Sequence, residues 1–287
     1  MTGAMPWNNH PTGTSAGRPA SPSDGAPPAP TLAPAARRAR ALAEAEALAA
    51  AAPEALALVD AMIAHLRRRD GTTPPWVHDM AALSPRGARL LGQILGEGEV
   101  SGHVLDAGGG RVVVQESVLT GVWCLLRLDG AGRPRRRWIE IAAVPGVVAA
   151  ARPGRPAATL TPRPPPAGAI TVMPLLAEIA DHAARHTPGR PNHVISVSLL
   201  PVTRADLAHL GTTLGRGPVM LRVGGHGACV IQAAGVDRVW SVRFLNASDT
   251  VILDTLEVGD VPTAACAAPE DFADSAVRLT EIRDAYL

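Results

Sequence analysis

Apolar and polar positions follow the same order in two stretches of the chain. In each stretch, leucines at helical spacing come first, and short runs rich in Val and Ile follow, separated by glycine-containing turns. The runs predict strands at 98–105, 111–117, 121–128 and 137–143 in the first stretch, and at 217–223, 228–233, 238–245 and 251–258 in the second. Because short connections join antiparallel strands, each stretch predicts one helix laid on a small antiparallel sheet.

The two stretches are also similar residue by residue. LGQILGEGEV (91–100) matches LGTTLGRGPV (210–219), VQESVLTGVW (114–123) matches IQAAGVDRVW (231–240), and IEIAAVP (139–145) matches LEVGDVP (256–262). The first match is separated by 119 residues and the later ones by 117, which a single two-residue difference in a loop explains. The sequence therefore predicts an α+β fold of two tandem copies, at roughly 83–147 and 202–264.

Capping residues mark both ends of the helix that opens each copy. In the first copy, Ser84 is the expected N-cap and Gly96 follows the last turn. In the second copy, Thr203 is the expected N-cap and Gly215 closes the helix, with Asp206 in the first turn, where the helix dipole favours a negative charge. The leucines expected on the buried face of this second helix are Leu207, Leu210 and Leu214.

The segments outside the copies differ in composition. The first is rich in Pro, Gly, Ala, Ser and Thr, so it cannot bury enough apolar area to offset the entropy of ordering it. The expected parts are a disordered tail (1–36), an N-terminal helical region (37–80), a first repeat domain (81–148), a Pro-rich linker (149–168) and a second repeat domain with flanking helices (169–287). The last part is expected to hold a helix near 174–186, a strand near 193–199 and a terminal helix at 269–285 with Phe272, Ala276, Leu279 and Ile282 buried.

Composition narrows the classes of function. Hydrophobic residues make up 47% of the chain, enough for a sizeable core, and the formal net charge of +1 indicates neither nucleic-acid binding nor an anionic membrane surface. No apolar run approaches the ~20 residues of a membrane-spanning helix, and no secretory signal is visible. We therefore expect a cytoplasmic protein without stable membrane insertion. All 27 basic residues are arginine, which excludes a Walker A lysine and Schiff-base chemistry.

Two groups of residues raise the question of metal or thiol chemistry. Glu178, His182 and His186 are spaced i, i+4, i+8 on a predicted helix, so they share one face. A solvated face is the favoured interpretation, because the pattern is not HExxH. His226 and Cys229, in the segment GGHGAC, could form a metal or nucleophile pair, but no CxxC partner is present and an inert hairpin thiol is favoured. We predict no cofactor and no metal site.

Other patterns have a structural interpretation. Gly96-x-Gly98 and Gly215-x-Gly217 follow a helix and precede a strand, the reverse of a Rossmann loop, so they indicate caps and tight turns. The arginines of 133–137 indicate a solvated hairpin rather than a phosphate site.

Three pairs of residues in apolar surroundings are expected to be structural. Trp123 and Trp240 are matched and indicate core packing, and Cys124 and Cys266 read as small core residues. The matched carboxylates are Glu140 and Glu257, each expected to pair with an arginine or to lie on an open sheet face. Because no nucleophile, base and orienting group come together, the residues favour a binding protein over an enzyme.

Five segments in the right order carry a resemblance to a known family. They are LGEGEVSGHV, VQESVLTGVW, LGTTLGRGPVMLRVGGHGACVIQ, VWSVRFLNASDTVILDTLEVGDVP and AAPEDFADSAVRL. They resemble the HupH/HyaF family of hydrogenase expression/formation proteins over roughly 80–285. Two positions depart from that family, which often has tyrosine at the position of His226 and arginine at that of Cys124.

The resemblance implies a dedicated chaperone-like role in the maturation of uptake [NiFe]-hydrogenase. Its implied partners are the iron–sulfur small-subunit precursor, bound before twin-arginine export, and other hydrogenase accessory proteins. The alternative is a metal or iron–sulfur handling protein that uses His226 and Cys229.

Matched positions are mostly caps, turns and core, so partner binding is expected where the copies differ. The candidate residues are Glu97, Glu99, Glu116 and Ser117 in the first copy, and His226, Cys229 and Asn246 in the second.

Overall fold

The computed structural model describes residues 47–70, 73–151, 156, 160, 164, 167–169, 171–225 and 227–285. The predicted disordered tail (1–36), the start of the predicted helical region and most of the predicted linker lie outside the described residues.

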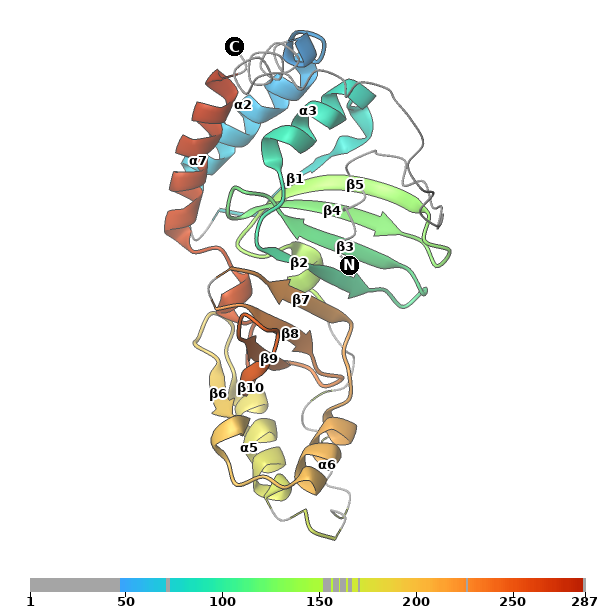
Figure 1. The fold of residues 1–287 in the computed structure, drawn as a ribbon, viewed down its shortest axis with the longest axis vertical. Helices are drawn as coiled ribbons and strands as arrows, with labels where there is room; N and C mark the ends of the chain where they lie inside the picture. Colours follow the sequence, from blue (N-terminus) through green and yellow to red (C-terminus); the bar gives the residue numbers. More distant parts are fainter. Residues whose placement is uncertain are drawn as a thin grey trace, which may run out of the picture.

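One antiparallel sheet of ten strands runs through the molecule (Figure 1). Its strands are β1 (Trp76–Asp79), β2 (Val100–Leu105), β3 (Arg111–Glu116), β4 (Val122–Leu128), β5 (Pro134–Ile141), β6 (His193–Ser196), β7 (Val219–Val223), β8 (Cys229–Ala233), β9 (Val239–Leu245) and β10 (Val251–Val258). Their order is β1-β5-β4-β3-β2-β7-β8-β9-β10-β6. The α+β class is as predicted, but the two small sheets are joined into one large sheet.

The two halves of the sheet meet where β2 pairs with β7, a junction that we call the seam. Val100 lies opposite Val223, Gly102 opposite Leu221 and Val104 opposite Val219. A Cβ atom on Gly102 would lie 2.1 Å from the Met220 carbonyl oxygen, so the close approach of β7 requires glycine there.

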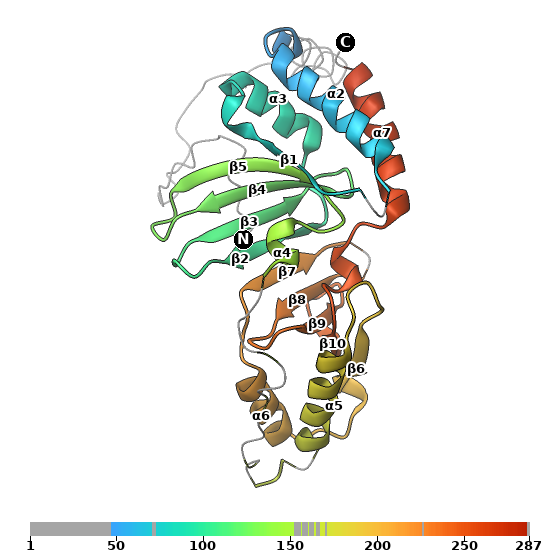
Figure 2. The same cartoon turned by 180° about the vertical axis from the view of Figure 1, so that it is seen from behind.

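The described helices lie beside both halves of the sheet. They are α2 (Pro53–Arg68), α3 (Pro85–Leu95), α4 (Gly146–Ala149), α5 (Val172–Arg185), α6 (Arg204–Leu214) and α7 (Pro269–Asp284), with short 3₁₀ turns η1 (Met80–Ala82), η3 (Val197–Leu199) and η4 (Thr263–Ala265). Figures 1 and 2 show α2, α3 and α7 beside the first half and α5 and α6 beside the second. None of the described helices has the length and apolar content needed to cross a membrane.

The predicted caps of α3 and α6 are confirmed. The Ser84 hydroxyl oxygen accepts a hydrogen bond from the Gly87 N–H at 3.0 Å. Thr203 and Asp206 form a reciprocal capping box, and Gly215 ends α6 with a φ of 68°. The prediction for Leu207 is wrong, since this residue is 45% exposed. Asp206 takes its place in the buried row of α6, together with Leu210 and Leu214.

Three clusters of apolar side chains fill the interior of the part of the chain that the structure describes. One joins α2, α3 and α7 to β4 and β5, a second joins α5 and α6 to β9 and β10, and a third spans both halves. Successive side chains of β4 point to opposite faces of the sheet, so Val122 packs in the first cluster and Trp123 in the third. Trp123 and Trp240 are both buried, which confirms core packing.

Helix α7 follows the second half in the chain but packs on the first. The Arg283 Nη1 atom lies 2.6 Å from the Asp60 carboxylate of α2, and the Arg67 guanidinium donates to the Thr280 hydroxyl at 3.1 Å. The predicted stripe of Phe272, Ala276 and Leu279 is buried, and Ile282 packs against it. The predicted domain boundaries stay predictions.

Candidate functional site

A groove of about 550 Å³ opens at one end of the seam. It is lined by 97–100, 116–118 and 264–266, together with Thr120, Val223 and Arg278. We call it the seam groove. Both halves and α7 contribute to it, and its volume is in the range of ligand-binding pockets.

Tight backbone contacts place two carboxylates at the rim of the seam groove. Gly96 ends α3 with a φ of 54°, and the Gly98 N–H donates to the Glu116 carbonyl at 2.8 Å. A Cβ atom on Gly98 would lie 2.1 Å from the Ser117 carbonyl oxygen, so only glycine fits. The carbonyl of Glu99 accepts from the Gly224 N–H of the second half at 2.8 Å. Glu97 and Glu99 are therefore fixed at the backbone while their side chains stay exposed.

Glu116 is the buried carboxylate of the seam groove, with 6% of its surface exposed. Its Oε1 atom accepts a hydrogen bond from the Gly121 N–H at 3.0 Å. Burial raises the pKa of the Glu116 carboxyl to about 7, against this hydrogen bond, and the nearby charges of Asp271 and Glu99 raise it further.

The β3–β4 turn joins the seam groove to α7. The Arg278 guanidinium donates to the Val118 carbonyl at 3.1 Å, and the Ser275 hydroxyl donates to the Thr120 carbonyl at 3.0 Å. Ser117 is buried, and its hydroxyl is used within the turn by Leu119, whose N–H it accepts at 3.1 Å. Ser117 therefore shapes the groove and presents no free hydroxyl to a partner.

The seam groove favours a cationic ligand. Its charged lining, among the residues that the structure describes, consists of Glu97, Glu99, Glu116 and Arg278. Neither Glu97 nor Glu99 pairs through its side chain with any other residue that the structure describes. Exposed carboxylates without an internal partner are free to accept hydrogen bonds from arginine or lysine.

A second groove of about 390 Å³ lies at the opposite end of the seam. It is lined by 104–107, 216–218 and Ala151. In the matched segments, Arg216 stands where the first half has Glu97, and Pro218 where it has Glu99. The two ends of the seam therefore differ in charge.

The other predicted partner-binding residues do not line the seam groove. Cys229 begins β8 with its side chain fully buried, and burial raises the pKa of its thiol. The Asn246 side chain accepts from the N–H groups of Ser248 and Thr250, both at 2.9 Å, and so holds the β9–β10 turn. His226 lies outside the described residues.

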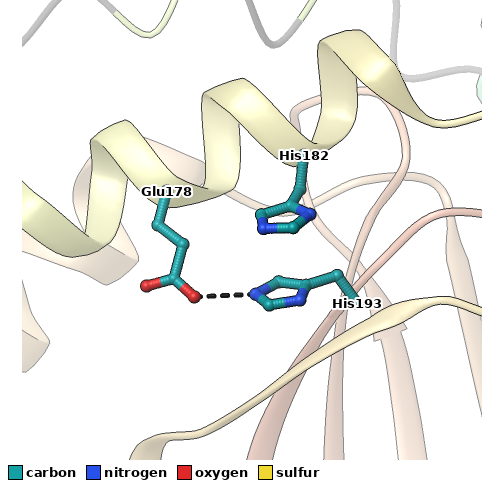
Figure 3. A group of neighbouring side chains, drawn as sticks. All are labelled: Glu178, His182 and His193. Carbon is teal, nitrogen blue, oxygen red and sulfur yellow. Dashed lines mark hydrogen bonds and ion pairs between the residues drawn. The ribbon is translucent and has the colours of Figure 1, made fainter.

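The metal-ligating side chains that lie together in the structure differ in one residue from the predicted helix face. Glu178 and His182 lie together, but their neighbour is His193 of β6 rather than His186 (Figure 3). His186 is the C-cap of α5 with an extended backbone, and its Nε2 atom lies 3.3 Å from Asp260. The i+4 spacing ends with the helix, so His186 points elsewhere. His193 was not predicted, because its spacing to Glu178 crosses a loop.

The remaining predictions concern structural residues. Burial raises the pKa of the Cys124 thiol to about 12 and that of the Cys266 thiol to about 11. Cys124 packs against the first apolar cluster, as predicted, whereas Cys266 is partly buried and lines the seam groove. Arg133 and Arg135 both contact Asp129 within their own hairpin.

The matched glutamates both have polar partners, and the charge of Arg69 also acts on Glu140, as the predicted arginine pairing implies. Glu140 is buried and accepts from the Gly146 N–H at 2.7 Å, and Glu257 accepts from the Asn192 amide at 2.9 Å. These hydrogen bonds to the two carboxylates come from a backbone N–H and a side-chain amide.

Comparison with known proteins identifies the family of this chain. The family model of the HupH hydrogenase expression protein, C-terminal conserved region, matches residues 52–154 and 169–286. The chain is 48% identical over 197 residues to the hydrogenase expression/formation protein HupH of Rhizobium leguminosarum bv. viciae, covering 69% of this chain and 70% of that one. It is 37% identical over 230 residues to HoxQ of Cupriavidus necator, covering 80% of each chain.

Two further similarities are more distant. The hydrogenase-1 operon protein HyaF of Escherichia coli is 30% identical over 236 residues, with 80% of each chain covered. The solved structure of the hydrogenase expression protein HupH from Thiobacillus denitrificans is 30% identical and has a TM-score of 0.36, covering 38% of this chain and 92% of that one. The family model and the relatives agree, and the chain belongs to the HupH family of hydrogenase expression/formation proteins.

Proposed function

We propose that this protein is a dedicated, chaperone-like accessory factor that binds the iron–sulfur small-subunit precursor of a [NiFe]-hydrogenase in the cytoplasm before export, without catalysing a reaction. Support for a role in hydrogenase maturation comes from the relatives, which are named hydrogenase expression/formation proteins. The choice of the precursor as client is our inference.

The seam groove is the site that we propose for the client. Its rim carboxylates, Glu97 and Glu99, have no pairing partner among the described residues, and Glu116 adds a third carboxylate inside. This is the observation that carries the proposal, because a cationic segment of the client would supply the missing charge. Charge-assisted hydrogen bonds between guanidinium and carboxylate are short and directional.

We infer that the two halves are diverged copies of one unit. Their caps, turns and core positions are alike, whereas the residues at the two ends of the seam differ. The Gln115 amide donates to the Gly98 carbonyl at 3.1 Å, and the matched Gln232 amide donates to the Gly217 carbonyl at 3.2 Å. Each copy thus fastens its helix–strand turn in the same way. Because the two ends carry unlike charges, only the acidic seam groove, and not the groove at Arg216, suits a cationic segment of the client.

A capture experiment tests the site. The tagged full-length protein is purified from cells that express the hydrogenase operon, and the co-purified small-subunit precursor is measured by immunoblot. The double variant Glu97→Arg/Glu99→Arg is expected to capture at least about tenfold less precursor, because like charges replace complementary ones. Capture by the unmodified protein is expected to weaken in high salt, because exposed charges are screened.

The matched control is Arg216→Glu at the opposite end of the seam, which is expected to leave capture unchanged. Equal capture by the double variant and the unmodified protein would exclude the seam groove as the binding site. In a strain that lacks the gene for this protein, unprocessed small-subunit precursor is expected to accumulate. Fully processed, active hydrogenase in that strain would refute the maturation role itself.

A further inference from the structure

Three metal-ligating side chains meet on the outer edge of the second half. Glu178 and His182 lie one turn apart on α5, and His193 is the first residue of β6, the edge strand that pairs with β10. One ligand atom from each lies within 4.8 Å of the others. We call these three residues the edge triad, and Figure 3 shows their side chains turned toward one another.

The side chains of the edge triad already interact. The His193 Nε2 atom lies 2.7 Å from a Glu178 carboxylate oxygen. The rings of His182 and His193 stack with their centroids 3.5 Å apart and their planes 1° from parallel. Each histidine ring thus contacts another member of the edge triad, and both imidazole nitrogen and carboxylate oxygen are ligands of first-row metal ions.

The separations match a metal site after a small adjustment. Zinc binds imidazole nitrogen and carboxylate oxygen at about 2.0–2.2 Å, so tetrahedral ligand atoms lie about 3.4 Å apart. The parallel rings must tilt until both lone pairs point at one centre. Glu178 is exposed and both histidines are partly exposed, so their side chains have room for this rotation.

We propose that Glu178, His182 and His193 form a binding site for a divalent first-row metal ion of the zinc type. Two imidazoles and one carboxylate leave one tetrahedral position open, as in exchangeable and catalytic sites rather than closed structural ones. Imidazole ligands select zinc, nickel or copper over magnesium, which prefers oxygen alone. The site goes beyond the proposed client binding and does not depend on it, since the edge triad and the seam groove share no residue.

Calorimetric titration of the untagged full-length protein with Zn²⁺ tests the site, since a polyhistidine tag would itself bind the ion. One equivalent of Zn²⁺ is expected to bind through the triad. His182→Gln, His193→Gln and Glu178→Gln are each expected to weaken this binding at least about tenfold. Mg²⁺ at the same concentration is expected to give no binding heat.

Two variants on the same helix serve as matched controls. Asp181→Asn removes a neighbouring carboxylate that pairs with Arg185 and is expected to leave zinc affinity unchanged. His186→Gln is expected to do the same, because His186 lies by Asp260 outside the triad. Far-ultraviolet circular dichroism and thermal melting verify that each variant is folded.

The outcomes are distinct. Absence of zinc binding, or binding that survives all three triad substitutions, would overturn the proposal. Loss of binding in His186→Gln with retention in His193→Gln would overturn it in favour of the helix-face set. Precursor capture by the triad variants is expected to be normal, so a failure of this inference is distinguishable from a failure of the proposed function.

Discussion

Glu116 links the chemistry of the seam groove to the stability of the fold. Its carboxyl pKa is about 7 in the folded protein and near 4.5 when exposed. The folded state therefore holds the proton more tightly, and stability is lost as the pH rises from about 4.5 to about 7. At 1.36 kcal/mol per pKa unit, the loss is roughly 3 kcal/mol.

The substitution Glu116→Gln is expected to remove this pH dependence, because the amide cannot ionise yet can still accept from the Gly121 N–H. Urea denaturation at pH 5 and pH 8 gives the free energy of unfolding. The difference in this free energy between Glu116→Gln and the unmodified protein is expected to favour the variant more at pH 8 than at pH 5. Glu97→Gln, at the exposed rim, is the control and is expected to change both values equally. An equal effect of Glu116→Gln at both pH values would contradict the prediction.

Sequence reasoning located the groove carboxylates for a physical reason. Glu97, Glu99 and Glu116 interrupt an otherwise matched frame, and the frame brings the interrupted positions to one end of the seam. The same reasoning failed for Cys229, since a difference between halves does not reveal whether the side chain is buried. It also missed His193, since helical spacing describes only neighbours on one helix.

At the scale of elements, one carboxylate caps two helices. The Asp206 Oδ1 atom accepts from the N–H groups of Thr171 and Val172 at the start of α5, both at 2.9 Å. Its Oδ2 atom accepts from the Thr203 N–H at 2.8 Å and from the Thr203 hydroxyl at 2.7 Å. The sequence predicted the role in α6 but not the role in α5, because the second contact spans more than thirty residues.

The substitution Asp206→Ala is expected to destabilise the protein by freeing the first turns of both α5 and α6. The hydrogen bond from the Thr203 side chain lowers the pKa of Asp206, so this stabilisation is present above the unfolded pKa of 3.8 and is lost as the pH falls through the lower folded value.

Thermal unfolding followed by circular dichroism at pH 7 and pH 3 checks the prediction. The melting temperature of the variant is expected to lie below that of the unmodified protein at pH 7, with a smaller gap at pH 3. Glu270→Ala, an exposed acidic residue in the first turn of α7, is the control. A melting temperature for Asp206→Ala no lower than for Glu270→Ala would count against the double cap.

Helices and long strands could be predicted because caps and apolar spacing are local. The short edge strands were harder. β1 was missed, since four residues between loops show too little alternation, and β6 ends earlier than predicted because Val197–Leu199 turns into a 3₁₀ helix.

At the scale of the whole molecule, the seam holds the two halves in one sheet. A side chain at Gly102 would meet the Met220 carbonyl oxygen and, at 2.8 Å, the Leu221 Cα atom. Both are backbone atoms of β7 and cannot turn away. The substitution Gly102→Val is therefore expected to lower the free energy of unfolding by at least about 2 kcal/mol, through strain or loss of the β2–β7 pairing.

Urea denaturation measures this loss, and precursor capture is expected to fall with it, since both halves line the groove. Gly211→Ala is the matched control, because nothing lies within 4 Å of its added Cβ in the exposed face of α6. That control is expected to be neutral or to add up to about 1 kcal/mol. A Gly102→Val protein as stable as the control would show that the seam tolerates a side chain.

The single sheet could not be predicted from the sequence. Alternation along β2 and β7 reports which side chains are buried, but it does not report which strand lies beside which. The close approach of β7 to Gly102 is seen only in the structure.

The position of α7 has a consequence for the order in which the protein is made. α7 follows both halves in the chain, yet Arg278 lines the seam groove and Phe272 packs in the first core. A nascent chain on the ribosome therefore completes neither the groove nor that core until all ten strands have been translated. Under the proposed function, an unfinished chain is therefore expected not to sequester the precursor until synthesis has passed α7.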